Sequence, residues 1–541
     1  MALTLARVAC RGQIGLQAPL VHVEVSVSSG LPAFSIVGLP ATVVKESKER
    51  VRAAILSSKF EFPAGHITVN LAPADLPKEG GRYDLPIALG VLIATEQIRP
   101  ALSTLDACEF YGELGLSGEL RPTRGLLLAA AHASRHGHEL ILPRASAEEA
   151  LWVARTPVRA ASNLLEVCAH VEGKETLEPL PPVVAFGEPH DGGSGRPGRG
   201  LLDHALARTS LDLRDVRGQL NAKRALCIAA AGAHSLLLIG PPGSGKSMLA
   251  QRLLGLLPPL TEVEALEVAS IASVSAGGFN SRHFGQRPFR TPHHSASGAA
   301  LVGGGARARP GEVSLAHHGV LFLDELPEFQ RYVLESLREP LETGVVSVSR
   351  AAVQAQYPAA FQLIAAMNPC PCGHVGDPLG DCNCTPAEIQ RYRSKISGPL
   401  LDRIDMHVEV PHVELSEFDD AADRGESSAS AAMRVVRARR AQLARQGVCN
   451  ARLADSQVER WCCPDRAGRA VLDLAIKRLG FSARARGRVL KLARTIADLD
   501  EVETITASHV GQAVMFRCLD RTSFDGVAIT SPSAPCDRQP A

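Results

Sequence analysis

Short apolar runs and helical stretches follow one another through the first third of the chain. The segments HVEVSV at 22–27, FSIVG at 34–38 and HITVNL at 66–71 are β-type runs. Between them, VVKESKERVRAAILSS at 43–58 repeats apolar positions at helical spacing. This pattern predicts an α/β domain over residues 1–186.

The pattern then breaks at residues 187–202, where GEPHDGGSGRPGRG is dense in Gly, Pro and charge and has no apolar period. Such composition predicts a flexible linker. Over 203–412, the runs LLLIG, GVLFLDE and FQLIAAMN alternate with helical segments, which predicts a parallel sheet covered on both faces. Residues 413–521 are predicted to be helical throughout, with an amphipathic stretch from LDLAIKRLG to LARTIADL, and 522–541 to form a disordered tail.

Composition and charge narrow the class of protein. The 541 residues are 45% hydrophobic and 21% charged, as in globular proteins of several domains. A formal net charge of +1 gives no overall attraction to nucleic acid or membranes. The arginines of MRVVRARRAQLARQ at 433–446 spread around most of a helix, so we interpret it as a solvated or interface helix.

The chain shows no targeting pattern. Its N-terminal residues contain no signal-peptide core, and no later window has the length and apolarity of a membrane span. Thirteen cysteines, an odd number, argue against a disulfide framework. We therefore expect a cytoplasmic protein with reduced thiols and without a membrane partner.

A glycine-rich turn follows the run LLLIG and precedes the helical segment MLAQRLL. Strand, glycine-rich turn and helix in this order are typical of a Walker A loop, where backbone amides and the helix N-terminus face phosphate oxygens. We expect Lys246 to neutralise the β- and γ-phosphates of ATP and Ser247 to bind Mg²⁺. The predicted loop residues are Gly240, Pro241, Pro242, Gly243, Ser244, Gly245, Lys246 and Ser247.

Two further runs end in polar residues that suit the same chemistry. GVLFLDE ends in Asp324, expected in the Mg²⁺ shell, and Glu325, expected to polarise the attacking water. An acidic pair after a strand is usually a solvated strand end, but a preceding Walker A loop reverses that expectation. FQLIAAMN ends in Asn368, which could hydrogen-bond the γ-phosphate or the water, or could simply end the strand in a turn.

Arginines near the end of the predicted core are candidates for stabilising transferred charge. Arg403, after a short helical stretch in SGPLLDRIDMH, could reach the γ-phosphate of a neighbouring subunit, or could pair with Asp402 or Asp405. In FSARARGR, Arg484 is a candidate to couple the helical region to the γ-phosphate. Its competitors in that segment are Arg486 and Arg488.

Four cysteines follow Asn368 in the pattern C-x-C-x9-C-x-C. Four thiolates from two short knuckles could close on Zn²⁺, with His374 as a possible substitute ligand, or they could be reduced thiols in a Pro- and Gly-rich loop. The cysteines are Cys370, Cys372, Cys382 and Cys384.

Seven segments in this order resemble the magnesium-chelatase-like AAA+ ATPases of the YifB/ComM type: DVRGQLNAKRAL, GPPGSGKSMLA, FRTPHHSASGAALVGGG, GVLFLDELPEF, LREPLETG, AAMNPCPCG and SGPLLDRIDMHVEV. The resemblance covers nearly the whole chain. It implies a P-loop AAA+ core with a helical C-terminal lid, after an N-terminal α/β domain similar to the ribosomal S5 and Lon-protease fold. It also implies that His293 and His294 lie in a substrate-facing loop, whereas two adjacent histidines by themselves are more often structural or solvated.

The same resemblance implies a homo-hexameric ring with Asn368 as sensor 1, Arg403 as arginine finger and Arg484 as sensor 2. Family members of the ComM type are DNA helicases of branch migration, which implies single-stranded or branched DNA as partner. Two departures are Ser247, where the family mostly has Thr, and SARARGR in place of the usual SARAYHR. The second leaves sensor 2 open among Arg484 and its two neighbours.

Two alternatives compete with a DNA motor. One is an ATPase that remodels proteins or serves a metal chelatase without moving on DNA, although no D-x-S-x-S metal motif is present. The other is an ATP-dependent protease, but KEGGRYDLP at 78–86 lacks the serine of Lon-type enzymes and RPTRGLLLAAA at 121–131 lacks the lysine. The sequence therefore argues against proteolysis.

Overall fold

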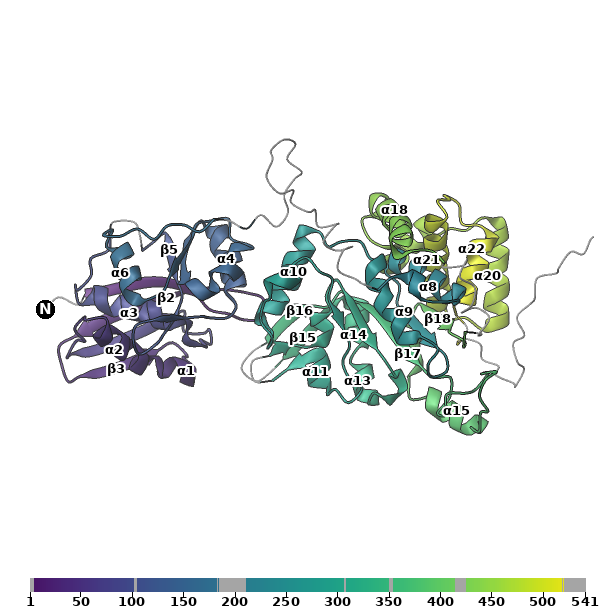
Figure 1. Cartoon of the computed structure of the whole chain (residues 1–541), viewed down its shortest axis with the longest axis horizontal. Helices are drawn as coiled ribbons and strands as arrows, with labels where there is room; N and C mark the ends of the chain where they lie inside the picture. Colours follow the sequence, from purple (N-terminus) through teal and green to yellow (C-terminus); the bar gives the residue numbers. More distant parts are fainter. Residues whose placement is uncertain are drawn as a thin grey trace, which may run out of the picture.

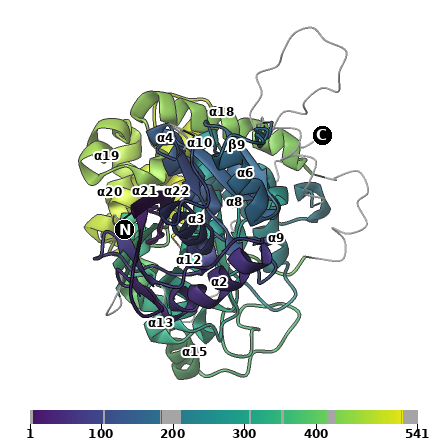
Figure 2. The ribbon, with the colours of Figure 1, turned by 90° about the vertical axis from the view of Figure 1, so that its left-hand side faces the viewer.

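The computed structural model of the chain is elongated, with an α/β domain at one end and a bundle of helices at the other (Figure 1). Figure 2, the view from the N-terminal end, shows the first domain in front of the rest of the chain. The predicted linker at 187–202 and the predicted tail at 522–541 lie outside the described residues. Those residues are 4–101, 105–181, 183, 211–305, 308–349, 354–413, 425–517 and 519.

The N-terminal domain is a seven-stranded mixed sheet covered by helices. Alternate residues of β2 (Leu20–Ser28) are buried, so one face of the sheet is apolar. Helix α3 (Asp84–Ala94) lies against that face closely enough that a Cβ on Gly90 would come within 2.4 Å of Val25. In sheet order the other strands are β3 (Ala33–Val37), β4 (His66–Ala72), β1 (Thr4–Arg11), β5 (Cys108–Phe110), β8 (Glu139–Pro143) and β9 (Val158–Ala161).

The remaining elements of this domain are helices and one two-stranded hairpin. The segment expected to be one helix at 43–58 is divided into α1 (Thr42–Lys45) and α2 (Ser47–Ser57), while the three predicted strands are confirmed. The other elements are β6 (Glu113–Leu114), β7 (Leu120–Arg121), α4 (Leu126–His136), α5 (Ala147–Leu151) and α6 (Leu164–Val171).

A buried ion pair joins the centre of the N-terminal sheet. Arg11, on β1, and Glu109, on β5, are 2% and 0% exposed, and their side chains meet at 2.7 Å. Tyr111 donates its hydroxyl to Glu109 at 2.5 Å, and His138 Nδ1 lies 2.8 Å from the same carboxylate. Burial raises the pKa of Tyr111 well above its ordinary value, so it stays a donor. The buried carboxylate of Glu109 is thus bonded to the side chains of Arg11, Tyr111 and His138.

The second domain has a five-stranded sheet whose strands are all parallel. Alternate residues of each central strand are buried on opposite faces: Leu236 and Leu238 belong to one apolar cluster, Leu237 and Ile239 to another. The predicted sheet covered on both faces is therefore confirmed. In sheet order the strands are β11 (Phe289–Arg290), β14 (Val320–Leu323), β17 (Gln362–Met367), β10 (Leu236–Ile239) and β18 (Met406–Glu409).

Helices and two hairpins cover this sheet. Helices α8 and α9 belong to the apolar cluster on one face, and α12 and α13 to the cluster on the other. The helices are α8 (Leu220–Gly232), α9 (Lys246–Arg252), α10 (Glu262–Val274), α11 (Gly298–Val302), α12 (Glu312–Leu315), α13 (Arg331–Glu335), α14 (Arg338–Thr343), α15 (Pro386–Arg393) and α16 (Gly398–Leu401). The hairpins pair β12 (Gly303–Gly304) with β13 (Arg309–Pro310) and β15 (Val345–Ser349) with β16 (Gln354–Pro358).

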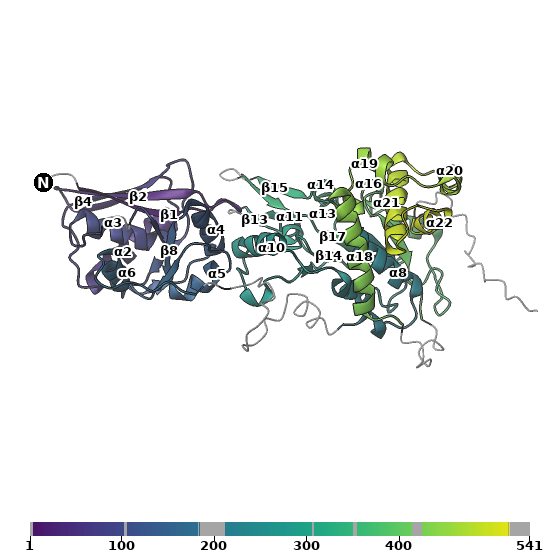
Figure 3. The same cartoon turned by 90° about the horizontal axis from the view of Figure 1, so that it is seen from above.

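The C-terminal region is helical from Ser428, and α18 lies across α8 in Figure 3. The expectation of one amphipathic stretch around LDLAIKRLGFSARARG needs correction, because Gly480 adopts φ +66° and ends α20, and Ser482 caps the next helix. Within the described residues no helix combines the length and apolarity that a membrane crossing needs. The helices are α18 (Ser428–Gln446), α19 (Asp455–Trp461), α20 (Arg466–Leu479), α21 (Ala483–Leu499) and α22 (Ala507–Met515).

The N-terminal domain touches the second domain through apolar and aromatic side chains. Leu128, on α4, is buried with the cluster that covers one face of the parallel sheet. The ring of Trp152 stacks at a tilt on Phe284, with centroids 4.4 Å apart, and meets the edge of Phe279. Helices α4 and α10 face each other here in Figures 1 and 3.

We predict that Arg11→Met lowers the free energy of unfolding of the N-terminal domain by about 3–5 kcal/mol, because it leaves the carboxylate of Glu109 buried without its cation. The double variant Arg11→Met with Glu109→Gln should recover part of that loss. Chemical denaturation followed by circular dichroism measures both. A loss below about 1 kcal/mol in the single variant would contradict this account.

Candidate nucleotide-binding site

The glycine-rich turn lies between β10 and α9, at the carboxyl edge of the parallel sheet. Gly243 and Gly245 adopt φ +79° and +89°, the left-handed region that side chains rarely enter. Gly240 has a different constraint, because a Cβ there would lie 2.1 Å from the carbonyl oxygen of Val410, just after β18. The glycine pattern is thus required both by turn conformation and by the neighbouring strand.

Lys246 begins α9 and is directed back into its own loop. Its Nζ donates to the carbonyl oxygens of Gly240 and Pro241, both at 2.8 Å, and to Oδ1 of Asn368 at 3.2 Å. Burial lowers the pKa of Lys246, while the carboxylates of Asp324 and Glu325 act to raise it. All three donors of the ammonium group are occupied, so a phosphate would have to take the place of these oxygens.

The two predicted Mg²⁺ residues are in contact. Ser247 Oγ donates to Oδ2 of Asp324 at 2.6 Å, and the backbone N–H of Glu325 donates to the other oxygen of Asp324 at 2.9 Å. Both acids follow β14, and Asn368 follows β17, so neighbouring parallel strands deliver them to the same edge. Hydroxyl and carboxylate oxygens are the ligands that Mg²⁺ prefers.

His294, which its sequence context does not assign to the nucleotide-binding site, lies beside Glu325. Glu325 itself has an unusual backbone conformation. Its φ is +51°, in the left-handed region, and its side chain is 56% exposed. Nδ1 of His294 lies 3.4 Å from Oε2 of Glu325, and the His294 ring stacks at a tilt on that of His293, 4.1 Å away. The His-His pair is visible in the sequence, but no sequence pattern predicts that it lies next to this carboxylate.

The arginines predicted to act on phosphate lie elsewhere. Arg403, Arg484, Arg486 and Arg488 line a cavity of about 910 Å³ that also contains Ser235 and Gln362. These last two residues stand at the beginnings of β10 and β17, whereas the glycine-rich turn stands at the end of β10. A four-residue strand separates the two places by about 13 Å. The structure therefore does not bring these arginines to the P-loop of their own chain.

Arg403 pairs with a residue far from it in the sequence. Its Nη2 lies 2.5 Å from Oε1 of Glu342, and its Nη1 donates to the carbonyl of Pro399 at 2.8 Å. The suggested partners Asp402 and Asp405 are thus not the ones observed. Glu342 belongs to LREPLETG, a segment that carries family resemblance but no chemical motif that would predict this pairing.

Asp405 instead joins the sheet to the helical region. Its carboxylate pairs with Arg488, lies 3.2 Å from Nδ1 of His234 and accepts the N–H of Ser235 at 3.1 Å. Burial would raise the pKa of Asp405, but Arg488 and the His234 bond hold it below its ordinary value. His234 Nε2 lies 2.8 Å from the hydroxyl of Thr495, on α21. Arg488 is therefore engaged within its own chain.

Arg484 and Arg486 differ from Arg488 in their contacts. Both are exposed at the cavity, and no carboxylate of the described residues forms an ion pair with either. Of the three candidate positions in FSARARGR, these two keep free guanidinium groups.

The four predicted cysteines come together after β17. All four sulfur atoms lie within 4.8 Å of one another. The backbone N–H groups of Gly373 and Val375 donate to Sγ of Cys370 at 3.2 and 3.4 Å. His374, considered as a substitute ligand, is turned away, and its Nδ1 lies 2.9 Å from Asp377. The cluster is therefore made of the cysteines.

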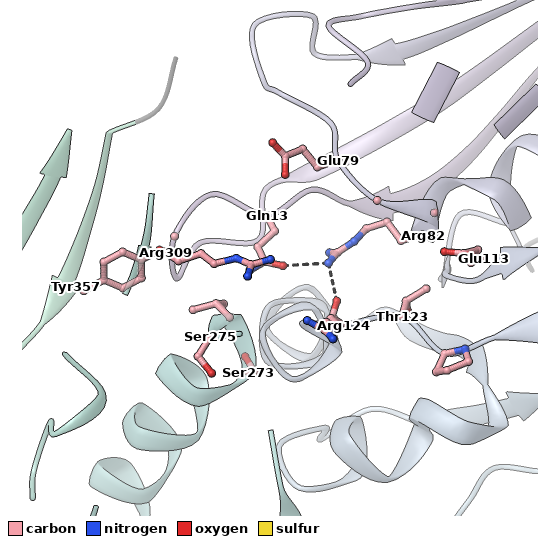
Figure 4. A pocket seen from close by; sticks show the side chains of 15 residues that line it. Gln13, Glu79, Arg82, Glu113, Thr123, Arg124, Ser273, Ser275, Arg309 and Tyr357 are labelled. Carbon is pink, nitrogen blue, oxygen red and sulfur yellow. Dashed lines mark hydrogen bonds between the residues drawn. The ribbon is translucent and has the colours of Figure 1, made fainter. Parts of the chain in front are cut away.

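A second cavity, of about 320 Å³, lies where the two α/β domains meet (Figure 4). Residues of both KEGGRYDLP and RPTRGLLLAAA line it. Arg82 Nη2 donates to the carbonyl of Arg124 at 2.6 Å and to Gln13 at 3.0 Å. Arg309 reaches in from the other domain, toward Gln13. None of the described residues that line this cavity is a lysine, so it offers no Ser–Lys dyad.

The arginines of α18 are mostly neutralised or hydrogen-bonded. Arg434, Arg437 and Arg445 pair with Glu426, Glu501 and Asp498, and Arg439 donates to backbone carbonyls of α8. This agrees with the interpretation of a solvated or interface helix.

Three family descriptions match successive parts of the chain. "Subunit ChlI of Mg-chelatase" matches residues 23–146, "Magnesium chelatase, subunit ChlI" matches 212–418, and "Magnesium chelatase, subunit ChlI C-terminal" matches 425–517. The second match contains the glycine-rich turn, Asp324, Glu325 and Asn368.

Several relatives are similar over almost the whole chain. "Uncharacterized protein YifB" of Salmonella typhimurium is 47% identical and "Competence protein ComM" of Haemophilus influenzae is 46% identical, each covering 96% of this chain and 98% of the relative. An uncharacterized protein of Mycobacterium tuberculosis is 41% identical, covering 93% of this chain and 96% of its own length.

Proposed function

This chain belongs to the YifB/ComM family of magnesium-chelatase-like AAA+ proteins, and from that membership we propose that it is an ATP-hydrolysing motor that acts on DNA in the cytoplasm. The observation that carries the ATPase part is the convergence of Lys246 on Asn368 and of Ser247 on Asp324 at one edge of the sheet. Three segments far apart in the chain meet there, and their side chains are of the kinds that phosphoryl transfer needs.

The proposed chemistry assigns each residue one task. The amides of the P-loop and Lys246 would bind the β- and γ-phosphates, and Ser247 and Asp324 would hold Mg²⁺, which would supply positive charge at the phosphate oxygens. Glu325 accepts a proton from the attacking water, and Asn368 orients that water or the γ-phosphate. The exposure of Glu325 leaves its carboxylate accessible to such a water.

The position of the arginines supports a ring of identical subunits. Because Arg403 and Arg484 lie about one strand length from their own P-loop, we propose that they reach the γ-phosphate held by the next subunit. Arg403 would then exchange Glu342 for the phosphate, and Arg484 or Arg486 would contribute the sensor 2 charge. A closed ring gives every P-loop such a neighbour, and we propose six subunits by family resemblance.

DNA is the proposed track because one relative is named a competence protein and the family resemblance points to helicases of branch migration. His294, in the loop expected to face the substrate, lies next to Glu325 and would therefore couple DNA binding to ATP hydrolysis. The alternative is an ATPase that remodels proteins or serves a metal chelatase without moving on DNA. The cofactors of the motor are ATP and Mg²⁺, and we assign Zn²⁺ to the four-cysteine cluster.

We predict that Lys246→Ala abolishes ATP binding and that Glu325→Gln binds ATP but turns it over about 100-fold more slowly or worse, since only the second keeps the phosphate cradle. Fluorescent-nucleotide titration and phosphate release measure the two effects. Unchanged phosphate release by either folded variant would refute the proposal that the protein is an ATP-hydrolysing motor.

We predict that Arg403→Ala and Arg484→Ala each lower ATP turnover, by as much as about 10³-fold for an arginine that meets the γ-phosphate. Mixing the Arg403→Ala chain with the Lys246→Ala chain should restore part of it, because one supplies the P-loop and the other the arginine. Arg478→Ala, on exposed α20 outside the cavity, is the matched control. Absence of recovery in a confirmed mixed assembly would speak against action between subunits.

We predict that forked or four-way DNA stimulates ATP turnover more than linear duplex, and that binding weakens steeply with added salt because phosphate contacts release counterions. Turnover is measured with each DNA alongside strand displacement. A protein that hydrolyses ATP but shows neither stimulation nor displacement would be assigned to the remodelling or chelatase-type alternative.

A further inference from the structure

The cysteine cluster lies directly on the nucleotide-binding site. Cys370 is two residues after Asn368, and Gly373 lies against the P-loop. A Cβ on Gly373 would come within 2.6 Å of the Pro242 ring, and it would also be 4.0 Å from the side-chain carbon of Asn368. The cluster loop, residues 370–384, thus touches one wall of the predicted phosphate cradle and carries Asn368 at its base.

The sulfur positions suit a single tetrahedral metal ion. The separations between Cys370, Cys372 and Cys382 are 3.3, 3.8 and 3.6 Å, and the fourth sulfur lies within 4.8 Å of the others. Four thiolates at about 2.3 Å from Zn²⁺ lie about 3.8 Å from one another. A disulfide needs about 2 Å between sulfurs, and an iron–sulfur cluster needs room for several atoms between the thiolates.

Backbone donors complete a metal–thiolate environment. The two N–H groups aimed at Sγ of Cys370 offset its negative charge, as outer-sphere hydrogen bonds do in metal sites. Cys370 is buried, whereas Cys372 is exposed, so one ligand anchors the site in the core and another faces solvent. The donor set, its spacing and its partners therefore fit Zn²⁺.

A second contact ties the same loop to the other side of the P-loop. The carboxylate of Asp377 lies 2.9 Å from Nδ1 of His374 and 3.4 Å from Nε2 of His412. His412 follows Val410, whose carbonyl lies against Gly240. The loop therefore touches Pro242 directly and is joined to the segment that meets Gly240.

We infer that the metal–thiolate loop is a positioning device for ATP binding: Zn²⁺ at Cys370, Cys372, Cys382 and Cys384 fixes the loop so that Gly373 supports Pro242 and Asn368 stays on Lys246. The inference rests on the Zn²⁺ assignment proposed above. Without the ion, a 15-residue loop with little regular structure would have to hold these contacts through the Asp377 bonds and its own local hydrogen bonds. The cysteines are positioning residues, since none of them needs to touch the nucleotide.

The test uses the full-length protein. We expect about one Zn²⁺ per chain in the wild type, and loss of Zn²⁺ with about tenfold weaker binding of a fluorescent ATP analogue in Cys372→Ser and Cys382→Ser. Cys463→Ser, an exposed cysteine outside the cluster, should change neither quantity. Gly373→Ala should retain Zn²⁺ yet bind the analogue more weakly, because its Cβ would displace Pro242.

The possible outcomes distinguish Zn²⁺ binding from the positioning role of Zn²⁺. They also distinguish both of these from the proposed ATPase function. A wild type purified without Zn²⁺, and unable to take it up, overturns the inference and the assignment together. Zinc-free variants that bind the analogue like the wild type overturn the positioning role alone. Should the serine variants unfold, chelation of the wild type followed by Zn²⁺ addition decides, since analogue binding must fall and then return. Lys246→Ala should keep its Zn²⁺, so its loss of ATP binding reports on the motor only.

Discussion

A parallel sheet that is buried on both faces leaves only its two edges for polar chemistry, and the second domain is organised by that constraint. Side chains of β10, β14 and β17 point alternately into two apolar clusters, so charged groups appear only where the strands begin or end. At the carboxyl edge these groups are the P-loop, Asp324 and Asn368. At the amino edge they are Asp405, His234 and the arginines of the 910 Å³ cavity.

The C-terminal helices are also bonded to the rest of the domain at the amino edge of the sheet. Asp405 is buried and pairs with Arg488, while His234 reaches Thr495, so α21 is bonded to residues that precede β10 and β18. Arg403, whose carbonyl accepts from Arg488, belongs to the same group. A displacement of the helical region would therefore be felt at the arginines that the proposed function places on a neighbour's phosphate. This gives the lid a mechanical connection that does not pass through its own P-loop.

Local patterns predicted the fold class, and contacts between distant segments explain what they missed. The strands, the P-loop and the acidic pair follow from hydrophobic period and glycine spacing, which are properties of neighbouring residues. The partner of Arg403 is Glu342, the neighbour of Glu325 is His294, and the surface under Gly373 is Pro242. Each of these contacts depends on how strands are ordered in the sheet, which no single segment encodes. The sequence shows a glycine at position 480. It does not show that Gly480 adopts a left-handed conformation.

The separation of P-loop and arginines on opposite edges has a genetic consequence in the proposed ring. In that ring each chain would contribute to two nucleotide sites, its own and the next, so a well-folded copy defective in both contributions would inactivate both sites. Copies that lack Lys246 and Arg403 together would enter a ring made mostly of normal subunits and stop it at two adjacent places. Such an allele would be dominant over the wild-type gene, whereas one that prevents folding would be recessive.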